Sequence, residues 1–186
     1  MMRLRPAGLL APALALAATA AGAQLVPGTR APENIAEAVD DAHGVVCTLA
    51  AAGRPVGGLN IPLVGGEGYA PVDKVPDSLA RFVPGAPQQK IVEYRGEGGP
   101  LWIVYDSASR RCAIYAFADP APVEARLLET LDRSAKLHMW KRAKQVGPGI
   151  DDLYEWKAEP GLRLLTEISK PRAAGDPFVV VVRPSR

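Results

Sequence analysis

The chain has 186 residues, of which 48% are hydrophobic and 23% charged, so it is long enough for one domain with a real core. Lys and Arg number 22 against 20 Asp and Glu, and two of the basic residues fall in the first 23 positions, which leaves 20 of each sign in the remainder. Such a neutral chain has no basic stripe that could neutralise phosphates, so nucleic acid is excluded as an expected partner.

The N-terminus has the pattern of a secretory signal peptide. A basic front end is followed by an Ala- and Leu-rich run over 7–20 and by small residues at 21–23 ahead of Gln24. We expect cleavage after Ala23 and localisation in the periplasm or outside the cell. No later apolar run is long enough to cross a bilayer, so no transmembrane segment is expected after cleavage.

A first helix is predicted after a short leader. Residues 24–33 contain Pro and Gly and are expected to be mobile. Asn34 with Glu37 forms a capping-box pattern, and Gly53 supplies a stop. On a regular helix Cys47 lies on the flank of the apolar stripe. That stripe consists of Ile35, Val39, Ala42, Val46 and Leu49.

Residues 54–90 contain six prolines and six glycines, so only a short helix over 76–83 is expected there. Long irregular segments on a rigid scaffold are common recognition sites. We expect the stretch 59–73 to meet a partner, with Leu63 and Tyr69 as candidate contacts, because an exposed tyrosine offers a large contact area. The alternative is that the segment only covers the sheet.

The rest of the chain has strand patterns and one more helix. Aromatic and β-branched runs over 90–95, 101–106 and 112–118 indicate an antiparallel meander. Asp119 as N-cap and Pro120 then begin a second amphipathic helix. A hairpin turn is expected at 159–161. The further candidate strands are 137–143, 152–158, 162–169 and 178–183.

This order of elements predicts a single α+β domain over 34–186. An antiparallel sheet needs a cover for its apolar face, and the amphipathic helices are the available cover. We therefore expect an antiparallel sheet of about five to seven strands covered by two amphipathic helices. The densest basic stretches, 110–111 and 136–144, are interpreted as surface charges on a turn and a strand and not as a polyanion site.

Cys47 and Cys112 are the two cysteines of the chain. An even count in an exported protein favours a disulfide. Metal ligation would need further ligands at short spacing beside His43, and a nucleophilic cysteine would need a base. The chain has two histidines, His43 and His138, and neither lies in a recognisable motif. We expect a disulfide, no metal site and no cofactor.

A resemblance adds to this interpretation. The Ala-rich signal, the helix end "VVCTLAAAGRPV", the loop "LNIPLVGG" and above all "SRRCAIYAFADPAPVEARLLETL" resemble a group of small exported bacterial proteins with no assigned activity. The resemblance implies export, small size and two cysteines. It implies no catalytic residue.

Two hypotheses of function follow. The first is a non-enzymatic exported module that binds an envelope protein or component through residues 54–90 and the nearby sheet edge. The second is an unrecognised hydrolase or thiol-dependent enzyme that uses His138 or His43. A buried disulfide favours the first, whereas a free thiol of low pKa, or a histidine of strongly shifted pKa in a cleft, favours the second.

Overall fold

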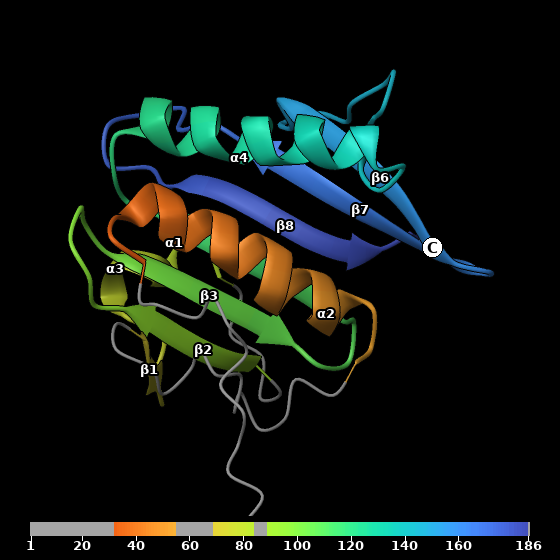
Figure 1. Ribbon diagram of the computed structural model, residues 1–186. Helices are drawn as coiled ribbons and strands as arrows, with labels where there is room; N and C mark the ends of the chain where they lie inside the picture. The colour runs from red at the N-terminus through yellow and green to blue at the C-terminus, as the bar shows by residue number, and fades with distance from the viewer. Residues whose placement is uncertain (1–31, 55–68, 84–88, 186) are drawn as a thin grey trace, which may run out of the picture.

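The computed structural model describes residues 32–54, 69–83 and 89–185 (Figure 1). The predicted signal peptide, most of the predicted leader and the candidate contact Leu63 lie outside these ranges. The last two leader residues are held in place, because Tyr94 Oη donates to the Pro32 carbonyl at 3.2 Å and the Glu33 amide donates to Glu37 at 2.7 Å. Among the described residues no helix combines the length and apolarity needed to span a bilayer.

Within the described residues, one antiparallel sheet contains all eight strands, in the order β1-β2-β3-β4-β8-β7-β6-β5. The α+β class is confirmed, and the number of strands exceeds the five to seven predicted. The strands are β1 Tyr69–Val72, β2 Gln89–Tyr94, β3 Leu101–Asp106, β4 Arg111–Ala116, β5 Lys141–Arg142, β6 Asp152–Glu159, β7 Leu162–Ser169 and β8 Phe178–Pro184.

The additional strand, β1, lies in the segment expected to contain no strand. It pairs with β2 at the edge of the sheet, where a proline such as Pro71 is tolerated because one side of an edge strand needs no partner. The opposite edge is shorter than predicted, since the strand expected over 137–143 is reduced to Lys141–Arg142.

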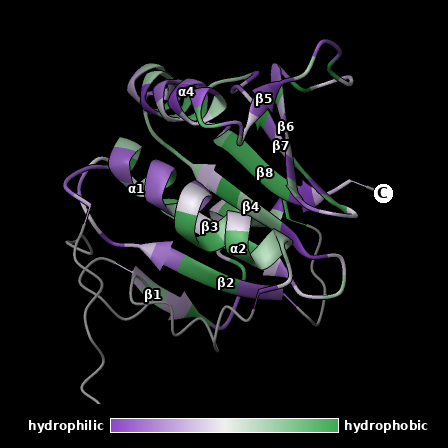
Figure 2. Ribbon diagram, turned by 45° about the vertical axis from the view of Figure 1, so that its right-hand side comes forward, coloured by the Kyte–Doolittle hydropathy of each residue, from purple (hydrophilic) through white to green (hydrophobic). Residues whose placement is uncertain are grey.

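The chain folds as two similar halves, each a helix followed by a four-stranded meander. The first helix is continuous over 35–51, with α1 Ile35–Asp41, η1 Ala42–Cys47 and α2 Thr48–Ala51 as its parts. The second is α4, Pro120–Lys136, whose 17 residues match that length. The last strands of the halves, β4 and β8, pair antiparallel at the centre, with Ile114 opposite Val180. The topology therefore has an approximate twofold axis at this pair, whose two strands lie side by side in Figure 2.

Both helix starts agree with their predicted caps. Asn34 Oδ1 accepts a hydrogen bond from the Glu37 amide at 3.0 Å, and Asp119 Oδ1 accepts one from the Ala121 amide at 3.1 Å. Each bond satisfies an amide of a first turn that has no partner within the helix. Pro120 occupies the first helical position, as predicted.

A π-helical turn over Ala42–Cys47 interrupts the first helix. Such a turn holds one residue more than an α-helical turn, so it rotates every later residue about the helix axis. Cys47 is consequently at the centre of the buried stripe and 0% exposed, not on its flank. The prediction that Leu49 is buried is wrong: its side chain is 44% exposed, and Ala50 and Ala51 pack inward in its place.

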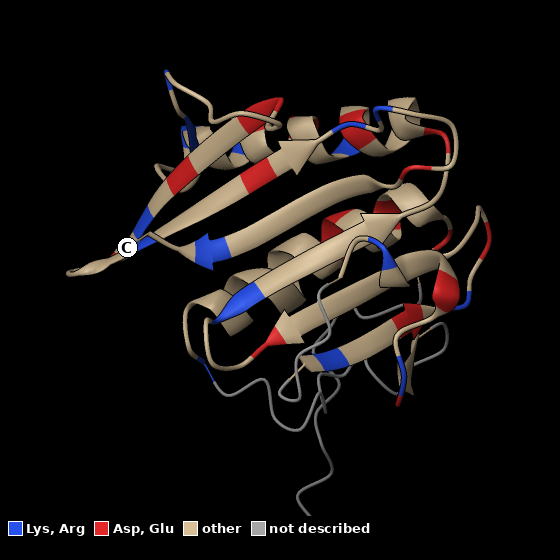
Figure 3. Cartoon of the chain, turned by 180° about the vertical axis from the view of Figure 1, so that it is seen from behind, with Lys and Arg blue, Asp and Glu red and all other residues tan. Residues whose placement is uncertain are grey.

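The helices cover one face of the sheet, and the main core lies between them and β3, β4, β8 and β7. Figure 2 shows hydrophobic residues along β4 and β8 beneath the helices. On the other face, the short helix α3, Asp77–Ala80, begins within the predicted range 76–83 and covers a smaller apolar cluster on β2, β3 and β4. The β6 and β7 part of that face carries charged side chains instead (Figure 3).

Candidate functional site

The two cysteines form a disulfide that joins the first helix to β4. Cys47 and Cys112 have an S–S distance of 2.03 Å, and both residues are 0% exposed. The predicted pairing is confirmed. Because the chain has two cysteines and neither is free, the proposed thiol chemistry has no nucleophile.

His43 lies in the π-helical turn and is enclosed by the main core. Its Nε2 is 2.9 Å from Thr166 Oγ1 on β7, and its ring centroid is 5.4 Å from that of Trp140. Burial lowers the pKa of His43 to about 4, because an imidazolium would lose its hydration. The histidine whose pKa is shifted therefore lies in the core and not in a cleft, so it has the position of a structural residue.

The prediction that Tyr69 is an exposed contact residue is wrong. The residue is 6% exposed, its hydroxyl donates to the Ala38 carbonyl at 3.2 Å, and its ring lies 5.3 Å from that of Tyr94. Burial raises the pKa of Tyr69. The cause is that Tyr69 begins β1 and points to the face covered by the helices. A partner therefore cannot use Tyr69 as a surface anchor.

His138 is exposed and terminates α4. Its backbone has a φ of 59°, and the amides of His138 and Met139 donate to the carbonyls of Ala135 and Ser134, both at 3.1 Å. This is the left-handed helix end that glycine usually provides. Residues 137–139 therefore belong to the helix end, and the strand predicted over 137–143 is reduced to Lys141–Arg142.

His138→Gly is expected to raise the free energy of unfolding by roughly 1 kcal/mol, because glycine adopts positive φ without the steric cost that a Cβ carries. Urea unfolding of the two proteins measures the difference. Lys136→Gly, within the last helical turn, is the matched control and should lower stability by about 1 kcal/mol. If both variants lose stability alike, the side chain of His138 stabilises the helix end by more than its positive φ costs.

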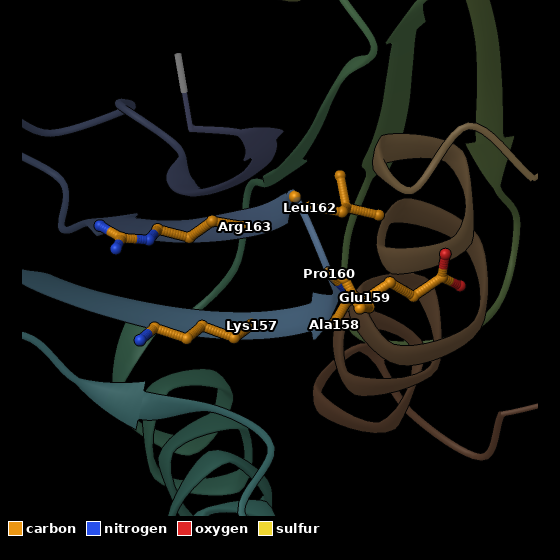
Figure 4. Close-up of a pocket in the computed structure, with 7 residues that line it drawn as sticks. Lys157, Ala158, Glu159, Pro160, Leu162 and Arg163 are labelled. Carbon is orange, nitrogen blue, oxygen red and sulfur yellow. The ribbon is translucent and has the colours of Figure 1, made fainter.

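A hollow of about 300 Å³ lies beside the short strand β5. His138 and Met139 bound one side of it, and Glu155 and Lys157 on β6 bound the other. A second hollow, of about 580 Å³, surrounds the β6–β7 hairpin over 157–163 and shares Lys157 with the first (Figure 4). Lys157 therefore connects two concave regions along one edge of the sheet.

Positive charge gathers at this edge. Lys157 is directly opposite Arg163, and Figure 4 shows both side chains extending to the same side of the two strands. Like charges in a cross-strand pair destabilise a sheet. Arg163 Nη1 is 3.8 Å from Glu155 Oε2, whereas Lys157 has no ion pair with any residue of the described ranges.

Most neighbouring carboxylates are already paired. Asp152 is buried and bonded to Arg142, and Glu159 pairs with Arg54. Glu155, the acidic residue among those lining the first hollow, has the 3.8 Å ion pair with Arg163. We call the surface formed by Lys141, Arg142, Lys144, Lys157 and Arg163 the basic edge.

Sequence reasoning found only part of this surface. The stretch 136–144 is basic, but the sequence alone indicates only surface charges on a strand there. A regular two-residue turn at Pro160-Gly161 would place Lys157 opposite Leu164, but a β-bulge between Lys157 and Glu159 moves it opposite Arg163. A change of register by one residue cannot be inferred from hydrophobic alternation alone.

Comparison of the chain with protein-family models, curated proteins and solved structures finds no match. The described residues contain no group of three His, Cys, Asp or Glu side chains placed to hold a metal ion. The chemistry that the basic edge can perform is the binding of anions, through ammonium and guanidinium groups that point into or beside the hollows.

Proposed function

We propose that the protein is an exported binding module whose basic edge holds an anionic partner, an acidic protein of the periplasm or the cell exterior. The observation that carries this proposal is the opposed pair Lys157 and Arg163. Two cations facing each other repel, and an anionic group placed between them removes that repulsion. Such a surface is therefore more stable with its partner than without it.

Export is supported by the signal-peptide pattern and by the resemblance to small exported bacterial proteins. The buried disulfide between Cys47 and Cys112 is compatible with an oxidising compartment, where disulfides form and persist. The non-enzymatic character is supported by the absence of a free thiol and by the enclosure of His43.

The proposed contact is electrostatic and should respond to salt. Lys141 is exposed and opposite Glu155 on β6, and it has no ion pair with a described residue. Exposed charges are screened strongly above about 0.1 M salt. Affinity for an anionic probe should therefore fall as the ionic strength rises.

Lys141→Glu/Lys157→Glu is expected to weaken binding of poly-L-glutamate by at least about tenfold, because each reversal replaces an attraction with a repulsion. Titration calorimetry at about 0.02 M and 0.2 M salt measures the effect. The matched control is Lys90→Glu on β2, an exposed lysine opposite Tyr105 that has no described ion pair. Equal affinity of the parent, the double variant and the control would refute binding at the basic edge.

A further inference from the structure

The edge of the sheet beside the first hollow is incompletely paired. β5 contributes two residues, Lys141 and Arg142, which face Glu155 and Tyr154. β6 continues to Glu159, and on the edge next to β5 no described strand pairs with β6 beyond Glu155. The cause is the left-handed turn at His138, which prevents residues before Trp140 from continuing β5.

The main chain of β6 faces this gap at a definite residue. The Ala143 amide donates to the Leu153 carbonyl at 2.7 Å, so the main-chain groups of Leu153 point towards β5. Groups of an antiparallel strand alternate between its two sides. The amide and carbonyl of Lys157, four residues later, therefore point to the same side as those of Leu153, at a position beyond Lys141, the first residue of β5.

The side chains around the gap differ between the two faces of the sheet. Lys141 and Lys157 lie on the outer face, since Lys141 is opposite Glu155 and the alternation repeats every two residues. Trp156 and Met139 are partly buried and pack against the main core on the inner side. A strand added here would meet lysines on one face and apolar side chains on the other.

We propose that an extended acidic segment of a partner protein adds to β6 in this gap as a further strand. The proposal rests on the proposed function and names the form of its partner. Main-chain groups of the segment pair with those of Lys157, while its acidic side chains contact Lys141 and Lys157. Its alternate apolar side chains lie on the inner face, towards Met139 and Trp156.

The charge of the edge identifies the occupant. Exposed edge lysines also discourage pairing between copies of a chain, because each copy brings the same charge. An acidic segment is attracted where a second lysine would be repelled, and it forms an opposite-charge cross-strand pair with the edge. A basic or neutral segment brings no such compensation.

The test uses a capped peptide of about eight residues that alternates Glu and Val, together with a matched peptide whose backbone amides are all N-methylated. The two peptides carry the same charge, but the second lacks the main-chain donors of a strand. We expect the first to bind and to slow hydrogen exchange of the Lys157 amide. The methylated peptide should bind at least about tenfold more weakly, because main-chain hydrogen bonds are lost.

Three other results would each contradict a different part of the proposal. Equal binding of the two peptides, lost in Lys141→Glu/Lys157→Glu, would retain anion binding and reject strand addition. Tight binding of an alternating Lys and Val peptide would reject the charge argument. If neither acidic peptide nor poly-L-glutamate binds, the proposed function fails together with the strand addition.

Discussion

Replacement of both cysteines by alanine is expected to lower the free energy of unfolding by roughly 4 kcal/mol. Cys47 and Cys112 are separated by 65 residues, so their bond restricts a long loop in the unfolded chain. Domains of this size are commonly stable by about 5–15 kcal/mol, so the loss is a large fraction of the total. Urea unfolding of Cys47→Ala/Cys112→Ala and of the oxidised parent measures the difference.

The reduced parent protein is the control that separates the covalent bond from packing. Both sulfur atoms are in the main core, so the alanine variant also loses their contacts. Reduction alone removes the bond but keeps the atoms, and it should produce most of the loss. A reduced parent as stable as the oxidised one would show that the disulfide does not stabilise the fold.

Acidification is expected to destabilise the protein through His43. Its pKa is about 4 in the folded protein and 6.5 in the unfolded chain, so between these values the unfolded chain binds a proton that the folded protein does not. Stability therefore falls as the pH drops from 6.5 towards 4, by about 3 kcal/mol from this residue. Urea unfolding at a series of pH values measures the slope.

His43→Gln is the matched variant for this measurement. Glutamine retains a polar group that can reach Thr166 but does not titrate, so the variant should lose the part of the slope due to His43. Carboxylates contribute equally in both proteins at low pH and cancel in the difference. Identical pH dependence in the parent and the variant would contradict the assignment of His43 as a buried neutral imidazole.

Local structure was largely predictable from local chemistry. Asn34 and Asp119 begin helices where their caps predict, and the strands β2, β3, β4, β6, β7 and β8 coincide with aromatic and β-branched runs. The errors occur where tertiary pairing or a turn overrides the local pattern. β1 forms despite Pro71 because β2 supplies its partner, and the alternating residues before Trp140 form a helix end instead of a strand.

Features that depend on one extra residue were not predictable. The π-helical turn changes which residues face the core, so Leu49 and Cys47 differ from their predicted positions. The β-bulge has the same effect in the sheet and creates the opposed pair Lys157 and Arg163. The strand order depends on the central pairing of β4 with β8, residues far apart in the chain, which no local pattern encodes.

The most direct test of the basic edge is amide NMR of the protein titrated with poly-L-glutamate at low salt. We expect the largest shifts on Lys141, Lys144, Glu155, Lys157 and Arg163, and we expect them to disappear in Lys141→Glu/Lys157→Glu. Amides of β1 and β2 at the other edge should remain unchanged. Shifts that spread over all lysines and arginines alike, or that centre on β2, would contradict binding at the basic edge.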